Sequence, residues 1–263
     1  MTIDTIFSRT IRPYAKEMGF KKAKQTYYRV VGDMLQTFRL KKLGYGCSVE
    51  FGLAPLCCGI INSIDIAVYD LDRFHIPISA HDYDFGSYYR VNERGEYYKN
   101  DETLQYVSDQ LCELMKEHVF PVFEKANHSS VAFDVIVNML AKAEECRLET
   151  LRIRNSSDHS QHSFEENLET EQALCSIAMK NYNYEFAAKY FRFIIKNNTD
   201  WLEIAKDYSW YESRVPEVKE RIKRNQIIID QLENDDREAI DKMLYDIEEK
   251  SKSVIASYGW KFE

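Results

Sequence analysis

The strongest constraint on the fold is a pair of β-type segments joined by two turn-forming residues. Residues 26–31 (Thr-Tyr-Tyr-Arg-Val-Val) and 34–40 (Met-Leu-Gln-Thr-Phe-Arg-Leu) are rich in β-branched and aromatic side chains. Gly32-Asp33 lies between them, and this dipeptide suits the two-residue turn that matches the twist of antiparallel strands. The sequence therefore predicts a β-hairpin over these residues.

The turn also sets which residues face one another across the hairpin. Counted outward from the turn, the facing pairs on one side are Val31 with Met34, Arg29 with Gln36, and Tyr27 with Phe38. A polar pair thus interrupts an apolar face. A guanidinium beside an amide can bind an anion or a partner's carboxylate, or it can pair with an internal acid. The candidate binding residues are Tyr27, Tyr28, Arg29, Gln36 and Arg39.

The segments around the hairpin complete a small α+β domain. Residues 3–18 carry apolar side chains every three or four positions, which predicts a helix that ends at Gly19. Alternating residues 47–53 predict a third strand, and 64–69 predict a fourth. A helix beginning at Asn100-Asp101 is expected to end at Pro121. We expect an antiparallel meander sheet packed on a helix.

The C-terminal half has helical spacing and helix-start signals throughout. Ser163–Glu166 has the pattern of a capping box, and further starts are expected at Thr199-Asp200, Pro216 and Asn234-Asp235. The polar run 155–163 has the composition of a linker. We therefore expect an α+β domain over 1–128 and an all-helical domain over 129–263, with 155–163 as an alternative boundary.

Four short motifs in the N-terminal third resemble a bacterial family known only as domain of unknown function 4304. They are Met18-Gly-Phe-Lys-Lys22, Thr26-Tyr-Tyr-Arg29, Leu35-Gln36 and Val49-Glu-Phe-Gly-Leu-Ala-Pro55, in that order. The resemblance implies an α+β fold and transfers no catalytic residue.

A helical hairpin in the C-terminal half resembles a tetratricopeptide unit. The residues that carry this resemblance are Leu174, Cys175 and Ala178, then Asn183-Tyr-Glu185, then Ala187, Phe191 and Ile194. Small and aromatic side chains at these spacings let two helices approach closely. A second copy is not evident, so a single hairpin is expected.

Composition favours a cytoplasmic protein. The sequence has no run of about 20 apolar residues of the kind that spans a bilayer, and residues 1–12 lack a signal-peptide pattern. Its six cysteines include no Cys-x-x-Cys spacing, so we expect reduced thiols. The net charge of −8 disfavours nucleic acid as a partner, although residues 1–42 hold ten basic and only three acidic side chains.

Candidate catalytic residues are confined to one acidic segment. His81, Asp82 and Asp84 could bind a divalent cation or perform acid–base chemistry, or they could form a polar loop. His159 and His162 have the spacing of metal ligands, yet their serine-rich context favours a solvated loop. The common nucleotide-binding, serine-hydrolase and zinc-protease motifs are missing. We therefore expect no cofactor and no metal, and enzyme activity is less favoured than its absence.

These observations favour a protein-interaction module of the adaptor or toxin-neutralising kind, with another protein as its partner. The charge and the many tyrosines of the chain suit protein interfaces. Two alternatives stay open: a metal-dependent or hydrolytic enzyme using the segment around His81–Asp84, and a nucleic-acid binder using the basic N-terminal segment.

Overall fold

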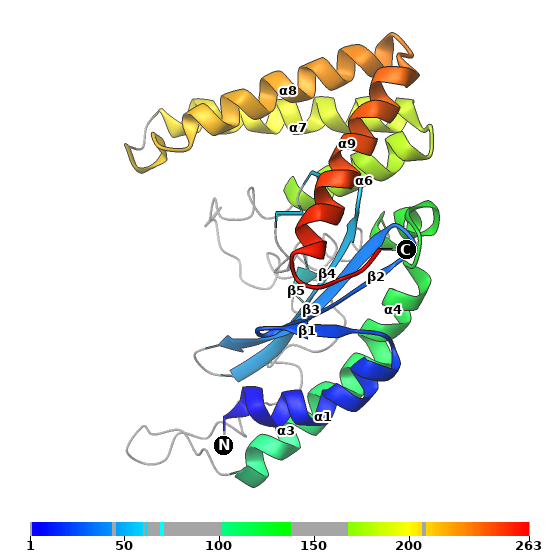
Figure 1. Ribbon diagram of the computed structural model, residues 1–263. Helices are drawn as coiled ribbons and strands as arrows, with labels where there is room; N and C mark the ends of the chain where they lie inside the picture. The colour runs from blue at the N-terminus through cyan, green and yellow to red at the C-terminus, as the bar shows by residue number, and fades with distance from the viewer. Residues whose placement is uncertain are drawn as a thin grey trace. The chain divides into compact units, whose positions relative to one another are not determined.

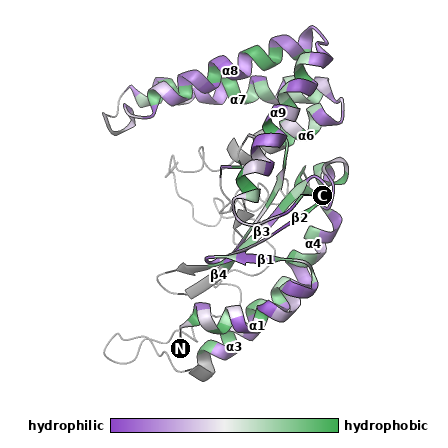
Figure 2. Ribbon diagram, in the orientation of Figure 1, coloured by the Kyte–Doolittle hydropathy of each residue, from purple (hydrophilic) through white to green (hydrophobic). Residues whose placement is uncertain are grey.

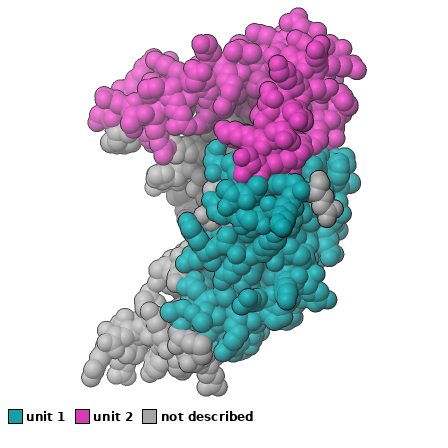
Figure 3. Space-filling model, in the orientation of Figure 1, with its two compact units in different colours: residues 1–54, 61–159, 254–263 teal, residues 55–60, 160–253 magenta. Residues whose placement is uncertain are grey.

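The computed structural model describes residues 2–43, 46–59, 61–62, 69–70, 101–137, 168–206 and 209–262 (Figure 1). The chain divides into two compact units, coloured separately in Figure 3. The first comprises residues 1–54, 61–159 and 254–263, and the second comprises residues 55–60 and 160–253. The proposed division into 1–128 and 129–263 stays a prediction, and its alternative boundary at 155–163 lies outside the described residues.

The first unit contains a sheet whose strands follow one another in chain order, β1-β2-β3-β4-β5. The strands are β1 (Lys21–Ala23), β2 (Thr26–Val31), β3 (Met34–Leu43), β4 (Gly46–Pro55) and β5 (Tyr69–Asp70). The predicted α+β class and meander are therefore confirmed. The other residues of the expected fourth strand lie outside the described part of the chain.

The hairpin between β2 and β3 has the predicted register. Val31 pairs with Met34, Arg29 with Gln36, and Tyr27 with Phe38. Gly32 adopts φ +57°, the left-handed conformation that a two-residue turn of this type requires. Glycine reaches this conformation without the steric cost that a Cβ brings, and the local sequence alone therefore specifies this part of the sheet.

Helix α1 (Ile3–Glu17) begins where the side chain of Thr2 accepts a hydrogen bond from the backbone N–H of Thr5. Its end is the predicted one, because Gly19 adopts φ +82°. The N–H of Phe20 then donates to the carbonyl of Ala15 at 2.8 Å, which turns the buried Phe20 back toward the helix. One apolar stripe faces the core and consists of Ile3, Ile6, Phe7, Ile11 and Ala15.

A second helical run covers the same face of the sheet as α1 (Figure 1). It consists of α3 (Asp101–Leu114), the π-helical turn η2 (Met115–Val119) and α4 (Phe120–Lys125). The expected end at Pro121 is wrong, because the helical backbone continues to Lys125. A proline ring normally collides with the carbonyl four residues earlier, and the widened turn of η2 immediately before Pro121 relieves that collision.

The core of the first unit is a cluster of aromatic rings between the sheet and these helices. Phe38 of β3 contacts Phe20 at 5.1 Å and Phe120 at 5.7 Å between ring centroids. Phe51 of β4 contacts Phe123 at 5.8 Å. Edge-to-face arrangements such as these add to the stabilisation that burial of the rings provides.

The last ten residues of the chain belong to this same unit. The hydroxyl of Tyr28 donates to the carbonyl of Tyr258 at 2.6 Å, and the ammonium of Lys21 donates to the carbonyl of Gly259 at 2.9 Å. Lys21 also lies 4.8 Å from the centre of the Trp260 ring. The C-terminal segment is thus held on β1 and β2 by residues more than 200 positions earlier in the chain.

The described residues of the second unit from 168 onward form helices joined by short turns. It contains α6 (Leu168–Lys180), α7 (Tyr184–Ala205), the short turn η4 (Ser209–Tyr211), α8 (Val215–Glu233) and the part of α9 (Arg237–Ala256) that ends at residue 253. Helix α7 packs against both α6 and α8. Figure 2 shows hydrophobic and hydrophilic residues interleaved along α7 and α8, as expected for amphipathic helices.

Helix starts in this unit agree in part with the predictions. Pro216 lies in the first turn of α8, as predicted. Thr199 and Asp200 do not begin a helix, because both lie inside α7. The hydroxyl of Thr199 donates to the carbonyl of Ile195, and Asp200 pairs with Lys196 one turn earlier. These are bonds that such residues form within a helix.

No helix in the described residues is long and apolar enough to cross a membrane. The capping box at Ser163–Glu166 lies outside the described residues.

Candidate functional site

The predicted polar pair forms a bridge between the hairpin and two helix ends. Arg29 Nε donates to Gln36 Oε1 at 2.7 Å, and Arg29 Nη1 donates to the carbonyl of Met18 at 2.6 Å. Gln36 Nε2 donates to the carbonyls of Phe123 and Ala126 at 2.6 and 3.1 Å. These carbonyls belong to the C-terminal ends of α1 and α4. Carbonyl groups at the end of a helix have no N–H donor within the helix itself.

The environment of Arg29 suits this bridging role. Its side chain is buried, and the guanidinium lies 4.6 Å from the centre of the Phe20 ring. Burial lowers the pKa of Arg29, while the carboxylate of Glu124 acts in the opposite direction. Helix C-termini carry partial negative charge, so a cation is favoured beside them. The pair therefore joins α1, the sheet and α4 by hydrogen bonds that need no external ligand.

The other predicted binding residues also have partners within the first unit. Tyr27 stacks on Phe38 with ring centroids 4.7 Å apart, and its hydroxyl donates to the carbonyl of Ser8. Arg39 forms an ion pair with Glu50 at 2.7 Å. The hairpin thus brings the five residues together, but it packs Tyr27, Tyr28 and Gln36 into the interior. Their assignment as a binding site stays a prediction.

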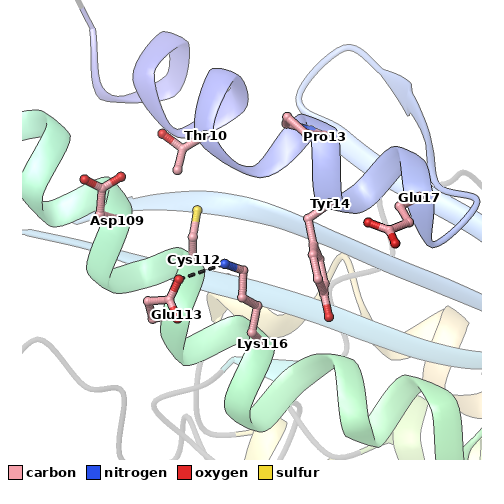
Figure 4. Close-up of a pocket in the computed structure, with 8 residues that line it drawn as sticks. All are labelled: Thr10, Pro13, Tyr14, Glu17, Asp109, Cys112, Glu113 and Lys116. Atoms are coloured by element: carbon pink, nitrogen blue, oxygen red, sulfur yellow. Dashed lines mark hydrogen bonds and ion pairs between the residues drawn. The ribbon is translucent and has the colours of Figure 1, made fainter.

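A pocket of about 360 Å³ lies between α1 and the α3–η2 run (Figure 4). The residues that line it are Thr10, Pro13, Tyr14, Glu17, Asp109, Cys112, Glu113 and Lys116. Lys116 Nζ donates to Glu113 at 2.7 Å and lies 5.5 Å from the centre of the Tyr14 ring. Polar groups from both helices therefore border the pocket, and part of their charge is compensated locally.

The chemistry of Cys112 argues against nucleophilic catalysis in this pocket. Burial raises the pKa of its thiol to about 12, and Asp109 contributes in the same direction. At neutral pH the group is therefore a protonated thiol, whereas a cysteine nucleophile reacts as the thiolate.

A second arrangement combines a serine, a histidine and an aspartate without the geometry of a catalytic triad. Asp33 accepts hydrogen bonds from the backbone N–H and the hydroxyl of Ser129 at 2.7 and 2.5 Å, at the start of the helical residues 129–137. His128 Nδ1 lies 3.6 Å from Asp33 and 3.2 Å from the hydroxyl of Ser130. In a triad, the aspartate and the serine bind different ring nitrogens. Here both lie beside Nδ1, so Asp33 acts as a helix cap.

The most exposed aromatic side chains of the described residues belong to the helical unit. Tyr182 in the turn between α6 and α7 is 61% exposed, and Tyr245 on α9 is 62% exposed. The ring of Tyr182 contacts that of Tyr184 at 6.1 Å, and Asp241 on α9 acts on the hydroxyl of Tyr184 electrostatically. Tyr245 follows Asp241 by one helical turn. We call Tyr182, Tyr184, Asp241 and Tyr245 the tyrosine surface.

The backbone of Tyr182 is unusual for such a large residue. It adopts φ +57°, and the N–H of Asn183 donates to the carbonyl of Ala178 at 2.8 Å. This is the helix-ending motif in which glycine normally occupies the left-handed position. A side chain with a Cβ costs about 1–2 kcal/mol there. Local stability therefore does not account for a tyrosine at position 182.

The tyrosine surface also carries a negative charge that no described residue pairs with. Asp241 forms no ion pair with the residues that the structure describes. The nearby Arg237 is already bound, because it donates to both carboxylate oxygens of Asp235 at 3.1 and 3.3 Å. Burial raises the pKa of Tyr184, and Asp241 raises it further. The surface thus combines exposed aromatic rings with a carboxylate that has no ion pair within the described part of the chain.

The candidate catalytic residues His81, Asp82 and Asp84 lie outside the described residues, as do His159 and His162. Among the described residues, no group of three or more histidine, cysteine, aspartate or glutamate side chains could hold a metal ion. Sequence reasoning did not single out Tyr182 or Tyr245. A tyrosine at the Asn181-Tyr182-Asn183 turn, where glycine is favoured, was the signal that could have pointed to Tyr182.

The first unit is therefore defined by an antiparallel meander that is packed on α1 and the α3–α4 run and bridged to both by Arg29 and Gln36. Residues 11–125 match the family described as Domain of unknown function (DUF4304), so the chain contains a DUF4304 domain over these residues. Neither the curated proteins nor the solved structures include a match to this chain. The resemblance of residues 174–194 to a tetratricopeptide hairpin stays a prediction.

Proposed function

We propose that the chain acts by binding another protein, and that the tyrosine surface of the helical unit is the docking site. The observation that carries the proposal is the exposure of Tyr182, which contacts Tyr184, and of Tyr245, one helical turn after Asp241. Tyrosine is among the residues that dominate protein interfaces, because its rigid ring contributes a large contact area at low entropic cost. A strained backbone at Tyr182 supports a functional reason for that side chain.

The chemistry of the tyrosine surface indicates which kind of protein it would bind. Exposed tyrosine rings attract cationic groups through their faces, and the Asp241 carboxylate offers an ion pair to the same cation. The net charge of −8 favours encounter with a basic partner as well. The expected partner is a protein that presents a lysine or arginine side chain to Asp241 and the neighbouring rings.

Site-specific photocrosslinking in the native cell tests this proposal. A photoreactive amino acid placed at position 182, and separately at 245, should crosslink the full-length chain to the same protein. Tyr106 on α3, which is 45% exposed and belongs to the other unit, is the matched control position. Crosslinks that differ between 182 and 245, or that occur equally at 106, would contradict a shared docking site.

Once the partner is purified, affinity measurements on variants show how much each residue contributes to the binding free energy. The Tyr182→Ser/Tyr245→Ser variant should bind roughly 30-fold more weakly, as expected for two hot-spot residues. Asp241→Asn should mainly reduce the salt dependence of binding, because it removes the proposed ion pair. Unchanged affinity in both variants would eliminate the tyrosine surface as the docking site.

A further inference from the structure

A second cluster of functional groups lies in the first unit, where β1 passes α1. Lys22 Nζ donates to the hydroxyl of Ser8 at 2.5 Å and lies 5.0 Å from the centre of the Tyr27 ring. Arg12 follows Ser8 by one helical turn on α1, so both side chains leave the same side of the helix. Lys22 of β1 is therefore in direct contact with Ser8 of α1, and Arg12 projects from the same side of that helix.

The two cations in this cluster are close enough to repel each other. Burial lowers the pKa of Lys22, and the charge of Arg12 lowers it further, while Asp4 acts in the opposite direction. Arg12 is exposed and forms no hydrogen bond or ion pair with the residues that the structure describes. Two cations from neighbouring elements, which Asp4 offsets only in part, favour the binding of an anion.

Other basic residues of the N-terminal segment are bound to groups of the same unit. Arg9 donates to Gln105 at 2.7 Å, Lys21 to the carbonyl of Gly259, and Arg39 to Glu50. Arg29 is bound to Gln36 and Met18. These four side chains are therefore engaged within the unit, whereas Lys22 lies within electrostatic range of Arg12.

We propose that Ser8, Arg12 and Lys22 bind a dianionic phosphate group, either inorganic phosphate or a phosphate monoester. The guanidinium offers a fork of N–H donors, the ammonium up to three donors and the serine one hydroxyl donor. A tetrahedral phosphate accepts hydrogen bonds from several directions and can neutralise both cations. A carboxylate or a phosphodiester offers only two charged oxygens and a single negative charge, so it can pair with fewer of these donors.

Calorimetric titration of the full-length chain tests the site. The probes are inorganic phosphate, O-phosphoserine as a monoester, and a dinucleotide without terminal phosphate as a phosphodiester. Phosphate and O-phosphoserine should bind saturably with one site per chain, and the dinucleotide should bind at least roughly tenfold more weakly. Saturable binding by the dinucleotide with equal affinity would overturn the assignment of a dianion.

Variants then localise the binding. Arg12→Gln/Lys22→Gln should weaken phosphate binding roughly tenfold or more, and Ser8→Ala should weaken it less. Lys125→Gln/Lys189→Gln, which removes two exposed charges on α4 and α7, is the charge-matched control and should bind like the unmodified chain. Because Lys22 also contacts Ser8 and the Tyr27 ring, circular dichroism of the double variant is measured first to establish that the fold is retained. Absence of saturable phosphate binding, or equal binding by the double variant, would refute the site.

Discussion

Gly32 lies so close to the carbonyl oxygen of Asn127 that a Cβ on residue 32 would be 2.6 Å from it. This contact joins the β2–β3 turn to the segment after α4. We expect Gly32→Ala to lower the free energy of unfolding by about 2–4 kcal/mol, because it adds both a backbone collision and left-handed strain. Gly19→Ala is the matched control, since Gly19 has φ +82° and open space around it. Chemical denaturation that gives equal losses would show that the Asn127 contact does not matter.

The Arg29–Gln36 bridge should behave as one energetic unit. Replacement of Gln36 by leucine leaves the Phe123 carbonyl and the Arg29 Nε without their partners. We expect Gln36→Leu to destabilise the first unit by about 2–4 kcal/mol. The Arg29→Met/Gln36→Leu double variant should cost less than the two single variants together, because the second change then removes no further bond between them. Additive losses in denaturant titrations would contradict this coupling.

Tyr182→Gly should raise the stability of the helical unit and weaken partner binding. Tyr182→Gly relieves the left-handed strain, and we expect the helical unit to gain about 1 kcal/mol. The same change removes the exposed ring and should weaken binding of the proposed partner. Thermal denaturation followed by circular dichroism measures the first effect. A loss of stability would show that the ring contact between Tyr182 and Tyr184 outweighs the backbone strain.

Glu248 should make the helical unit sensitive to acid. Burial raises the pKa of Glu248, but hydrogen bonds from Lys252 and Lys180 outweigh this effect, so the pKa in the folded chain is lowered. Its stabilisation is therefore complete above the unfolded pKa of about 4.3 and is lost as the pH falls through the folded pKa. Urea titrations between pH 3 and 7 should show this loss, and Glu248→Gln should remove it. Glu220→Gln, an exposed position on α8, should leave the pH profile unchanged.

Cys112 should be unreactive in the folded chain. A thiol with its pKa raised to about 12 holds almost no thiolate at pH 8, and its burial hinders access. Iodoacetamide followed by mass spectrometry should leave Cys112 unmodified under native conditions and modify it in denaturant. Rapid native labelling would show that the pocket between α1 and α3 opens far enough to expose the thiol.

The sequence predicted those features that depend on neighbours along the chain. The hairpin register follows from the Gly32-Asp33 turn, and the end of α1 follows from Gly19. The predicted helix end at Pro121 was wrong, because a widened turn of five residues accommodates the proline in a continuing helix. The predicted helix start at Thr199 was wrong as well, since a threonine inside a helix can donate its hydroxyl to a carbonyl of the preceding turn.

The proposed site residues also combine features that the sequence predicts with contacts that only tertiary packing sets. Arg29 and Gln36 stood out in the sequence because a polar pair interrupted an apolar face, yet their acceptors at Met18 and Phe123 come from separate helices. Ser8 and Lys22 are separated by a helix end and a turn, and only the packing of β1 beside α1 brings them within hydrogen-bonding distance. Tyr184 and Asp241 lie near each other for a similar reason.

By itself, the amino-acid sequence determined the first hairpin with its register, the strand that follows it and the apolar stripe of α1, because side-chain periodicity and turn preference act over a few residues. Tertiary structure alone decided which polar groups satisfy one another, which thiol is buried and which tyrosines face solvent. These properties depend on distances between segments far apart in the chain, and only the packed arrangement of the helices and the sheet sets those distances.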